Sequence, residues 1–234
     1  MVLAAATLVP AMVSSLAAGA SLPLPMPALV AVSALQSAAL LALAVWAGVA
    51  LAPRVGLHAP VAEAVAGRRP VTPAVRALLV PGLVLGVVAG AGLAALGAVA
   101  PAALVEAGER FAPSMAVRLL YGGVTEELLL RWGLLTALLA LLTRVLDGGA
   151  PAPGRAAVVM AVLGSALLFG LGHLPAARAL TGALTPDVVL YVVAGNAALG
   201  ALFGVAFVRW GLEAAVLAHA VAHVVGALVG SAVG

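Results

Sequence analysis

The sequence predicts an all-α fold, a polytopic transmembrane helix bundle of about seven to eight spans. Of the 234 residues, 65% are hydrophobic and only 8% are charged, and the mean hydropathy is +1.26. Soluble globular domains do not reach these values. The apolar stretches are long and do not alternate with polar residues, which favours helices over barrel strands. We therefore expect an integral, multi-pass membrane protein.

The order of the apolar stretches predicts one membrane domain, 1–234, with N-terminal spans in 1–100 and a candidate catalytic core in 113–232. Prolines, glycines and charges separate stretches long enough to cross a bilayer. The expected spans are 2–22, 28–52, 77–100, 113–142, 156–174, 188–208 and 212–229. The polar segment 53–76 and the long fourth stretch are the two places where an eighth helix would fit.

The basic residues, all of which are arginine, predict the orientation of the chain. Most of them fall in the segments 53–76 and 144–155 and at Arg209, which lie on one side of a bundle with seven spans. The positive-inside rule then places this side and the N-terminus in the cytoplasm. Scattered loop arginines do not form a nucleic-acid surface, so we expect no nucleic-acid partner. With no cysteine, the chain has no disulfide and no thiolate ligand or nucleophile. A plasma membrane of bacterial type is the expected location.

Two adjacent glutamates, Glu126 and Glu127, stand inside the fourth expected span together with Arg131. An ionisable group at the centre of a span costs about 2.5 to 3.5 kcal/mol on insertion scales, and such groups usually face a polar cavity and serve a function. Glu127 and Arg131, spaced i, i+4, can form an ion pair. Glu126 points elsewhere around the helix and is the carboxylate left free, as a general base requires. The alternative is an ion-paired helix interior without catalysis.

Histidines and an asparagine are the other polar residues within the spans. His219 and His223 are spaced i, i+4 on the last span, and His173 ends the fifth. With Glu126 they would supply a zinc site of nitrogen and oxygen ligands, although Ala220 stands where the metalloprotease signature His-Glu-x-x-His has its glutamate. Structural hydrogen bonding or packing would explain the same histidines. Asn196 is expected to form a hydrogen bond between helices.

The order Glu126-Glu127-x-x-x-Arg131, Phe169-x-x-x-His173, Asn196 and His219-x-x-x-His223 resembles the CPBP family over residues 117–226. This family comprises type II CAAX prenyl endopeptidases and bacteriocin-processing intramembrane proteases, and is also called the Abi family. The resemblance implies an endopeptidase in which Glu126 activates water, while His173 and His219 position it and stabilise the oxyanion. Glu127 and Arg131 would have supporting roles, and Phe169 would line the pocket. The family commonly has Asn, Asp or an apolar residue where this chain has His223.

This resemblance leaves metal use open. The sequence establishes no cofactor. Zinc bound by His173, His219 and His223 is an alternative, and it would make the protein a metalloprotease. The expected partners are a peptide or lipidated protein substrate and membrane lipid. Two other functions are compatible with the same residues, a proton-coupled transporter and a non-enzymatic membrane immunity or interaction protein. The chain shows no pair of corresponding broken helices in two halves, which counts against the transporter.

Overall fold

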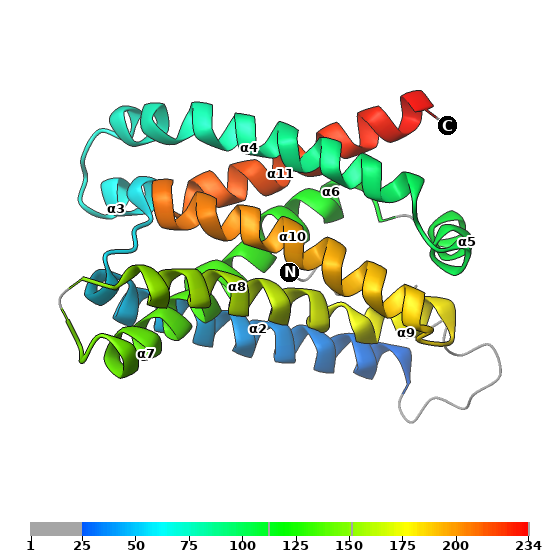
Figure 1. The fold of residues 1–234 in the computed structure, drawn as a ribbon, viewed down its shortest axis with the longest axis horizontal. Helices are drawn as coiled ribbons and strands as arrows, with labels where there is room; N and C mark the ends of the chain where they lie inside the picture. The colour runs from blue at the N-terminus through cyan, green and yellow to red at the C-terminus, as the bar shows by residue number, and fades with distance from the viewer. Residues whose placement is uncertain (1–24, 112, 151, 234) are drawn as a thin grey trace.

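The computed structural model describes residues 25–111, 113–150 and 152–233, and these residues form a bundle of helices (Figure 1). Every regular element in the described part is helical, so the predicted all-α bundle is confirmed. Six segments in this part are long and apolar enough to cross a membrane: Pro27–Val55, Thr72–Ala98, Met115–Leu146, Arg155–Thr181, Pro186–Trp210 and Leu212–Ala232. They correspond in order to the second to seventh expected spans. The first expected span, 2–22, lies outside the described residues.

The elements, in chain order, are α2 (Met26–Leu51), η1 (Ala52–Val55), α3 (Pro60–Ala66), α4 (Thr72–Ala98), α5 (Ala102–Arg110), α6 (Met115–Val117), η2 (Arg118–Glu126), η3 (Leu128–Leu135), α7 (Thr136–Leu146), α8 (Arg155–Gly172), α9 (Leu174–Thr181), α10 (Pro186–Trp210) and α11 (Leu212–Val233). The polar segment 53–76 contains α3, whose 7 residues are too few to cross a bilayer. The fourth span runs unbroken from α6 through η2 and η3 to α7. Neither of the two places considered for an eighth span therefore contains one.

Helices α4 and α11 pack along each other (Figure 1) because glycines line the face of α4 that meets α11. A Cβ atom at Gly86 would lie 2.5 Å from Val221 Cβ, and one at Gly90 would lie 2.5 Å from Val225 Cβ. Real side chains do not approach so closely, so only glycine allows this separation of the helices. Close approach through small residues is the main way in which helices associate in lipid, where hydrophobicity gives no driving force between them.

The direction of the helices alternates, which gathers most arginines at one end of the bundle. Helices α2, α7 and α10 end there, and α4, α8 and α11 begin there, next to α3 at the left of Figure 1. The turn from α10 to α11 at this end needs glycine at position 211, where φ is +92° and a Cβ would clash with the ring of Pro60. Helices α5 and α9 lie at the opposite end, at the right of Figure 1.

Candidate active site

The span that carries the two glutamates is wound more widely than an α-helix. Both η2 and η3 are π-helical, and the threonine hydroxyls follow this winding. Thr125 donates to the carbonyl oxygen of Leu120, five residues earlier, at 3.1 Å, whereas Thr143 in the α-helical α7 donates to Leu139, four residues earlier, at 2.8 Å. π-Helical segments occur frequently at functional sites. The sequence analysis assumed regular α-helical spacing here and did not predict this feature.

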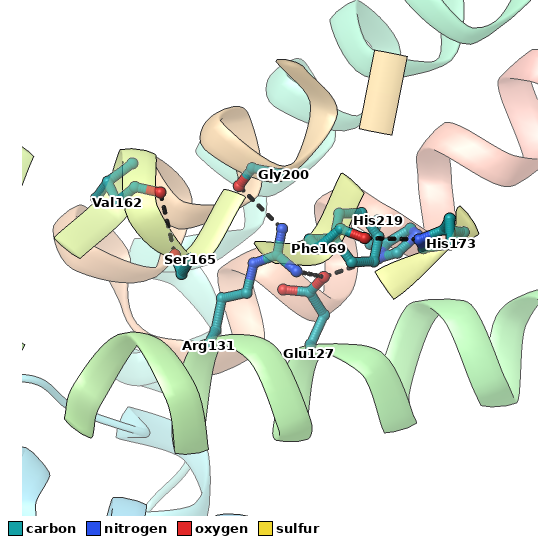
Figure 2. Close-up of polar contacts among 8 residues, drawn as sticks. All are labelled: Glu127, Arg131, Val162, Ser165, Phe169, His173, Gly200 and His219. Carbon is teal, nitrogen blue, oxygen red and sulfur yellow. Dashed lines mark hydrogen bonds and ion pairs between the residues drawn. The ribbon is translucent and has the colours of Figure 1, made fainter. Parts of the chain in front are cut away.

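Glu127 is the centre of a buried charge network (Figure 2). Its side chain is 0% exposed, and its Oε1 atom lies 3.2 Å from Nη1 of Arg131, so the ion pair expected from the i, i+4 spacing is present. The same oxygen accepts a hydrogen bond of 2.8 Å from Nδ1 of His219. Because a carboxylate accepts, His219 must donate from Nδ1, which leaves Nε2 free to act elsewhere. Glu127 thus links the fourth span to α11.

Arg131, which is 1% exposed, is held by more than its carboxylate partner. Its Nη2 atom donates to the backbone carbonyl of Gly200 in α10 at 2.9 Å. The guanidinium carbon lies 5.0 Å from the ring centre of Phe169 and 5.6 Å from that of Phe203. Aromatic faces attract a cation and lower the cost of burying it. The aromatic residue expected to line a pocket, Phe169, therefore packs against the buried cation.

The two histidines of α11 stack face to face, and their Nε2 atoms face the same glycine of η2. The ring centres of His219 and His223 are 4.9 Å apart, and His219 stacks on Phe203 at 4.4 Å. A Cβ atom at Gly122 would lie 2.6 Å from Nε2 of His223 and 3.5 Å from Nε2 of His219. The missing side chain at Gly122 thus makes room for both imidazoles beside the span that carries the glutamates.

His173 reaches the site from the end of α8. Its Nδ1 atom lies 2.8 Å from the carbonyl oxygen of Phe169, which can only accept, so Nδ1 carries the proton and Nε2 of the neutral ring is an acceptor. The rings of His173 and Phe169 meet edge to face at 4.6 Å. The helix end explains this bond, because the last carbonyl groups of a helix have no backbone partner.

Glu126 is half-buried next to Glu127. Among the described residues its carboxyl group has no hydrogen-bond partner, in contrast to that of Glu127. Of the three residues that the sequence analysis singled out for catalysis, His219 contacts Glu127, and His173 contacts Phe169, whose ring also lies beside His219. Among the described residues no contact joins Glu126 to either histidine, and the catalytic roles of the three residues stay predictions.

Asn196 behaves differently from the sequence prediction. Its Nδ2 atom donates to the carbonyl oxygen of Val192 at 2.8 Å, within α10, so the expected bond between helices is replaced by one to its own helix. Asn196 and His173 line a cavity of about 430 Å³ with Tyr191 and apolar residues of α5 and α9. The cavity lies at the end of the bundle opposite most of the arginines, and it gives His173 access from outside the bundle.

A metal ion would need at least three ligands in one place. Among the described residues, no three His, Asp or Glu side chains meet in a way that could hold one. His219 and His173 do have their Nδ1 atoms fixed as metal-ligating histidines do, but their Nε2 atoms do not converge with a third ligand. The residues therefore do not fit a metal held by protein side chains alone, and we derive no step through one.

Comparison with models of known protein families matches residues 108–225 to the family described as type II CAAX prenyl endopeptidase Rce1-like. The match covers just over half of the chain and includes every polar residue of the site. The chain belongs to this Rce1-like family. It is accordingly an intramembrane protease of the CAAX type in general terms, and an integral, multi-pass membrane protein. No curated protein and no solved structure matches the chain.

Three residues of the site were missed by the sequence analysis: Gly122, Gly200 and Phe203. Gly122 accommodates the imidazoles, the carbonyl of Gly200 receives Arg131, and Phe203 stacks on His219. Nothing in the sequence around these two glycines distinguishes them from glycines that only allow helices to pack closely. Phe203 carried a weak signal, because aromatic residues are few in this chain and it lies seven residues from Asn196 on the same helix.

Proposed function

We propose that this Rce1-like protein is a glutamate-dependent endopeptidase that uses no protein-held metal. Glu126 is the general base, and Glu127 positions His219 without acting on the substrate. The observation that carries the proposal is the different surroundings of the two carboxyl groups. Glu127 binds Arg131 and His219, while Glu126, its half-buried neighbour in the chain, has no hydrogen-bond partner among the described residues.

In the proposed reaction, the carboxylate of Glu126 accepts a proton from water, and the water oxygen attacks the carbonyl carbon of the scissile peptide bond. The unprotonated Nε2 of His173 accepts the second hydrogen bond of this water. The tetrahedral intermediate then breaks its C–N bond, and Glu126 gives its proton to the leaving amine. All atoms balance with one water consumed for each peptide bond.

His219 is the proposed partner of the oxyanion. In the proposal His219 enters the step already as the imidazolium and keeps its protons throughout, donating from Nε2 to the oxyanion. The carboxylate of Glu127 at its Nδ1 stabilises this cation, as an acid behind a histidine does in other hydrolases. Stacking on Phe203 and His223 fixes the plane of the ring. His223, whose Nδ1 is buried without a hydrogen-bond partner in the described part of the chain, supports this orientation.

The proposed substrate is a peptide or the lipidated C-terminal region of a protein. The cavity beside His173 and Asn196 supports this class, because its apolar wall from α4, α5 and α9 suits a lipid-bearing or hydrophobic peptide more than a polar one. Membership of a family described as prenyl endopeptidases favours a lipidated peptide.

The test is cleavage of a quenched fluorescent peptide library, with and without a prenyl group, by the full-length protein in proteoliposomes. Glu126→Gln keeps the size of the side chain and removes the base, so we expect cleavage to fall by about 10²- to 10⁴-fold. Glu106→Gln changes an exposed glutamate of α5 and is the matched control. Cleavage by the Glu126→Gln protein at the wild-type rate, with unchanged thermal stability, refutes the role of Glu126.

A further inference from the structure

The surface between α8 and α10 carries an apolar groove that ends in two arginines. The groove has a volume of about 470 Å³, and Arg155 and Arg209 stand among its lining residues together with Val159, Val162, Leu163 and Val205. Val159, Leu163 and Val205 are exposed, and they lie within segments that cross the membrane. A groove between two such segments faces the bilayer.

Both arginines lie at the same end of the groove because α8 begins with Arg155 and α10 ends just after Arg209. None of the ion pairs among the described residues involves either of them. Two carboxylates at this end of the bundle accept hydrogen bonds from backbone amides instead. Asp147 accepts from the amide of Gly154, and Glu213 accepts from that of Ala62. Two exposed guanidinium groups thus lie beside the groove without a carboxylate partner.

We propose that this groove binds an anionic glycerophospholipid, with an acyl chain along Val159, Leu163 and Val205 and the phosphate between Arg155 and Arg209. Guanidinium groups bind phosphate oxygens through paired hydrogen bonds, and basic pockets between transmembrane helices are a known setting for anionic lipid headgroups. Charge complementarity at one end and an apolar wall along the rest select a lipid over a free anion. The proposal does not depend on catalysis.

A second groove at the same end has the same design. It lies between α2 and α7, has a volume of about 500 Å³, and is bordered by Arg54 and Arg144. Neither of these arginines forms an ion pair with a described residue. The recurrence places paired arginines at the depth of one leaflet, which is the cytoplasmic leaflet under the predicted orientation. The α8–α10 groove is the one that we propose to test, because its apolar wall is the longer.

The experiment equilibrates the purified full-length protein in mixed micelles of phosphatidylglycerol and phosphatidylcholine and measures the lipids retained by native mass spectrometry. We expect the wild type to prefer phosphatidylglycerol. The double variant Arg155→Gln/Arg209→Gln should lose about tenfold or more of this preference, since each arginine near an anionic headgroup contributes severalfold. The control Arg68→Gln/Arg76→Gln removes the same charge at the same end of the bundle, away from the groove, and should stay within about twofold of wild type.

A second variant tests the acyl-chain part of the proposal separately. Ala201→Leu narrows the groove without changing charge, since Ala201 lines it, and it should lower retention of both lipids. Equal losses in the control and in the Arg155→Gln/Arg209→Gln protein would show a diffuse effect of positive charge and overturn the proposal. Unchanged preference in that protein, or complete displacement of the lipid by millimolar inorganic phosphate, would overturn it as well.

Discussion

Replacing Gly122 by alanine tests whether the space beside the imidazoles matters for catalysis. The added methyl group would lie 2.6 Å from Nε2 of His223 and 3.5 Å from Nε2 of His219. His223 must then retreat by about 0.8 Å to restore an ordinary contact, while His219 keeps its distance. The ring of His223 stacks on that of His219, so this movement disturbs the orientation of the proposed oxyanion partner.

The expected loss follows from this displacement. A shift of about 1 Å in a positioned group can cost about 10²-fold in rate, and the movement here reaches His219 indirectly, so we expect kcat to fall about 10- to 100-fold. Stability should change by no more than about 1 kcal/mol, because alanine favours a helix by about that amount over glycine and the clash falls on the end of a side chain. Peptide cleavage in proteoliposomes and thermal unfolding in detergent measure the two effects.

Gly123→Ala is the matched control in the same helix. Its methyl group would lie 3.3 Å from Cβ of Ala220, and its three nearest neighbours would all be atoms of Ala220 rather than of an imidazole. It should keep activity within about threefold of wild type, because only a few tenths of an ångström of adjustment are needed. Combining Gly122→Ala with His223→Asn shortens the side chain that clashes and should recover part of the loss, measured as a double-mutant cycle. Full activity in Gly122→Ala, or no recovery in the combination, would refute the reasoning.

Three further predictions concern the charge network, metal use and helix packing. Arg131→Gln leaves the fully buried carboxylate of Glu127 without its cation and should lower unfolding stability by about 3 to 5 kcal/mol, whereas the double variant Glu127→Gln/Arg131→Gln should unfold at a higher temperature than the single one. Incubation with a chelator such as 1,10-phenanthroline should leave cleavage unchanged, and loss of activity restored by zinc would contradict the proposed mechanism. Gly86→Ala, whose Cβ would lie 2.8 Å from the backbone oxygen of Ala218, should destabilise the protein by about 1 to 3 kcal/mol, while Gly92→Ala, with nothing within 4 Å of its Cβ, should be neutral or slightly stabilising in the same thermal assay.

The arrangement of the spans was readable from the sequence because hydrocarbon imposes a simple rule. Apolar stretches of sufficient length become helices, and the spans expected from residue 28 onward appear in order. The ion pair of Glu127 and Arg131 followed from helical spacing. The spacing of His219 and His223 correctly placed both rings on one face of α11. These are local patterns, and local patterns are what a single sequence contains.

The details that depend on several helices at once were not readable. The π-helical winding changes which residues of the fourth span face α11, and no residue type specifies it. His219 bonds to Glu127, whereas the resemblance had emphasised Glu126. This choice of partner depends on how far α11 is shifted along its axis relative to the fourth span. The packing of α11 on α4 includes glycine contacts such as Gly86 against Val221, and no local pattern in the sequence specifies such contacts.

The adjacency of Glu126 and Glu127 acquires a physical reason from this arrangement. A single carboxylate that paired with Arg131 and fixed His219 would have its lone pairs and its charge committed, and it would be a poor base for water. Placing that duty on the buried Glu127 leaves the carboxylate of the neighbouring Glu126 free for the proposed role as base. Glu127→Gln should therefore impair cleavage mainly by releasing His219, and a second change that holds this ring in another way should restore part of the activity. No change at His219 should restore the activity of Glu126→Gln. If a second-site change that restores the orientation of His219 rescued Glu126→Gln as well, the two carboxylates would share one role and this division would be wrong.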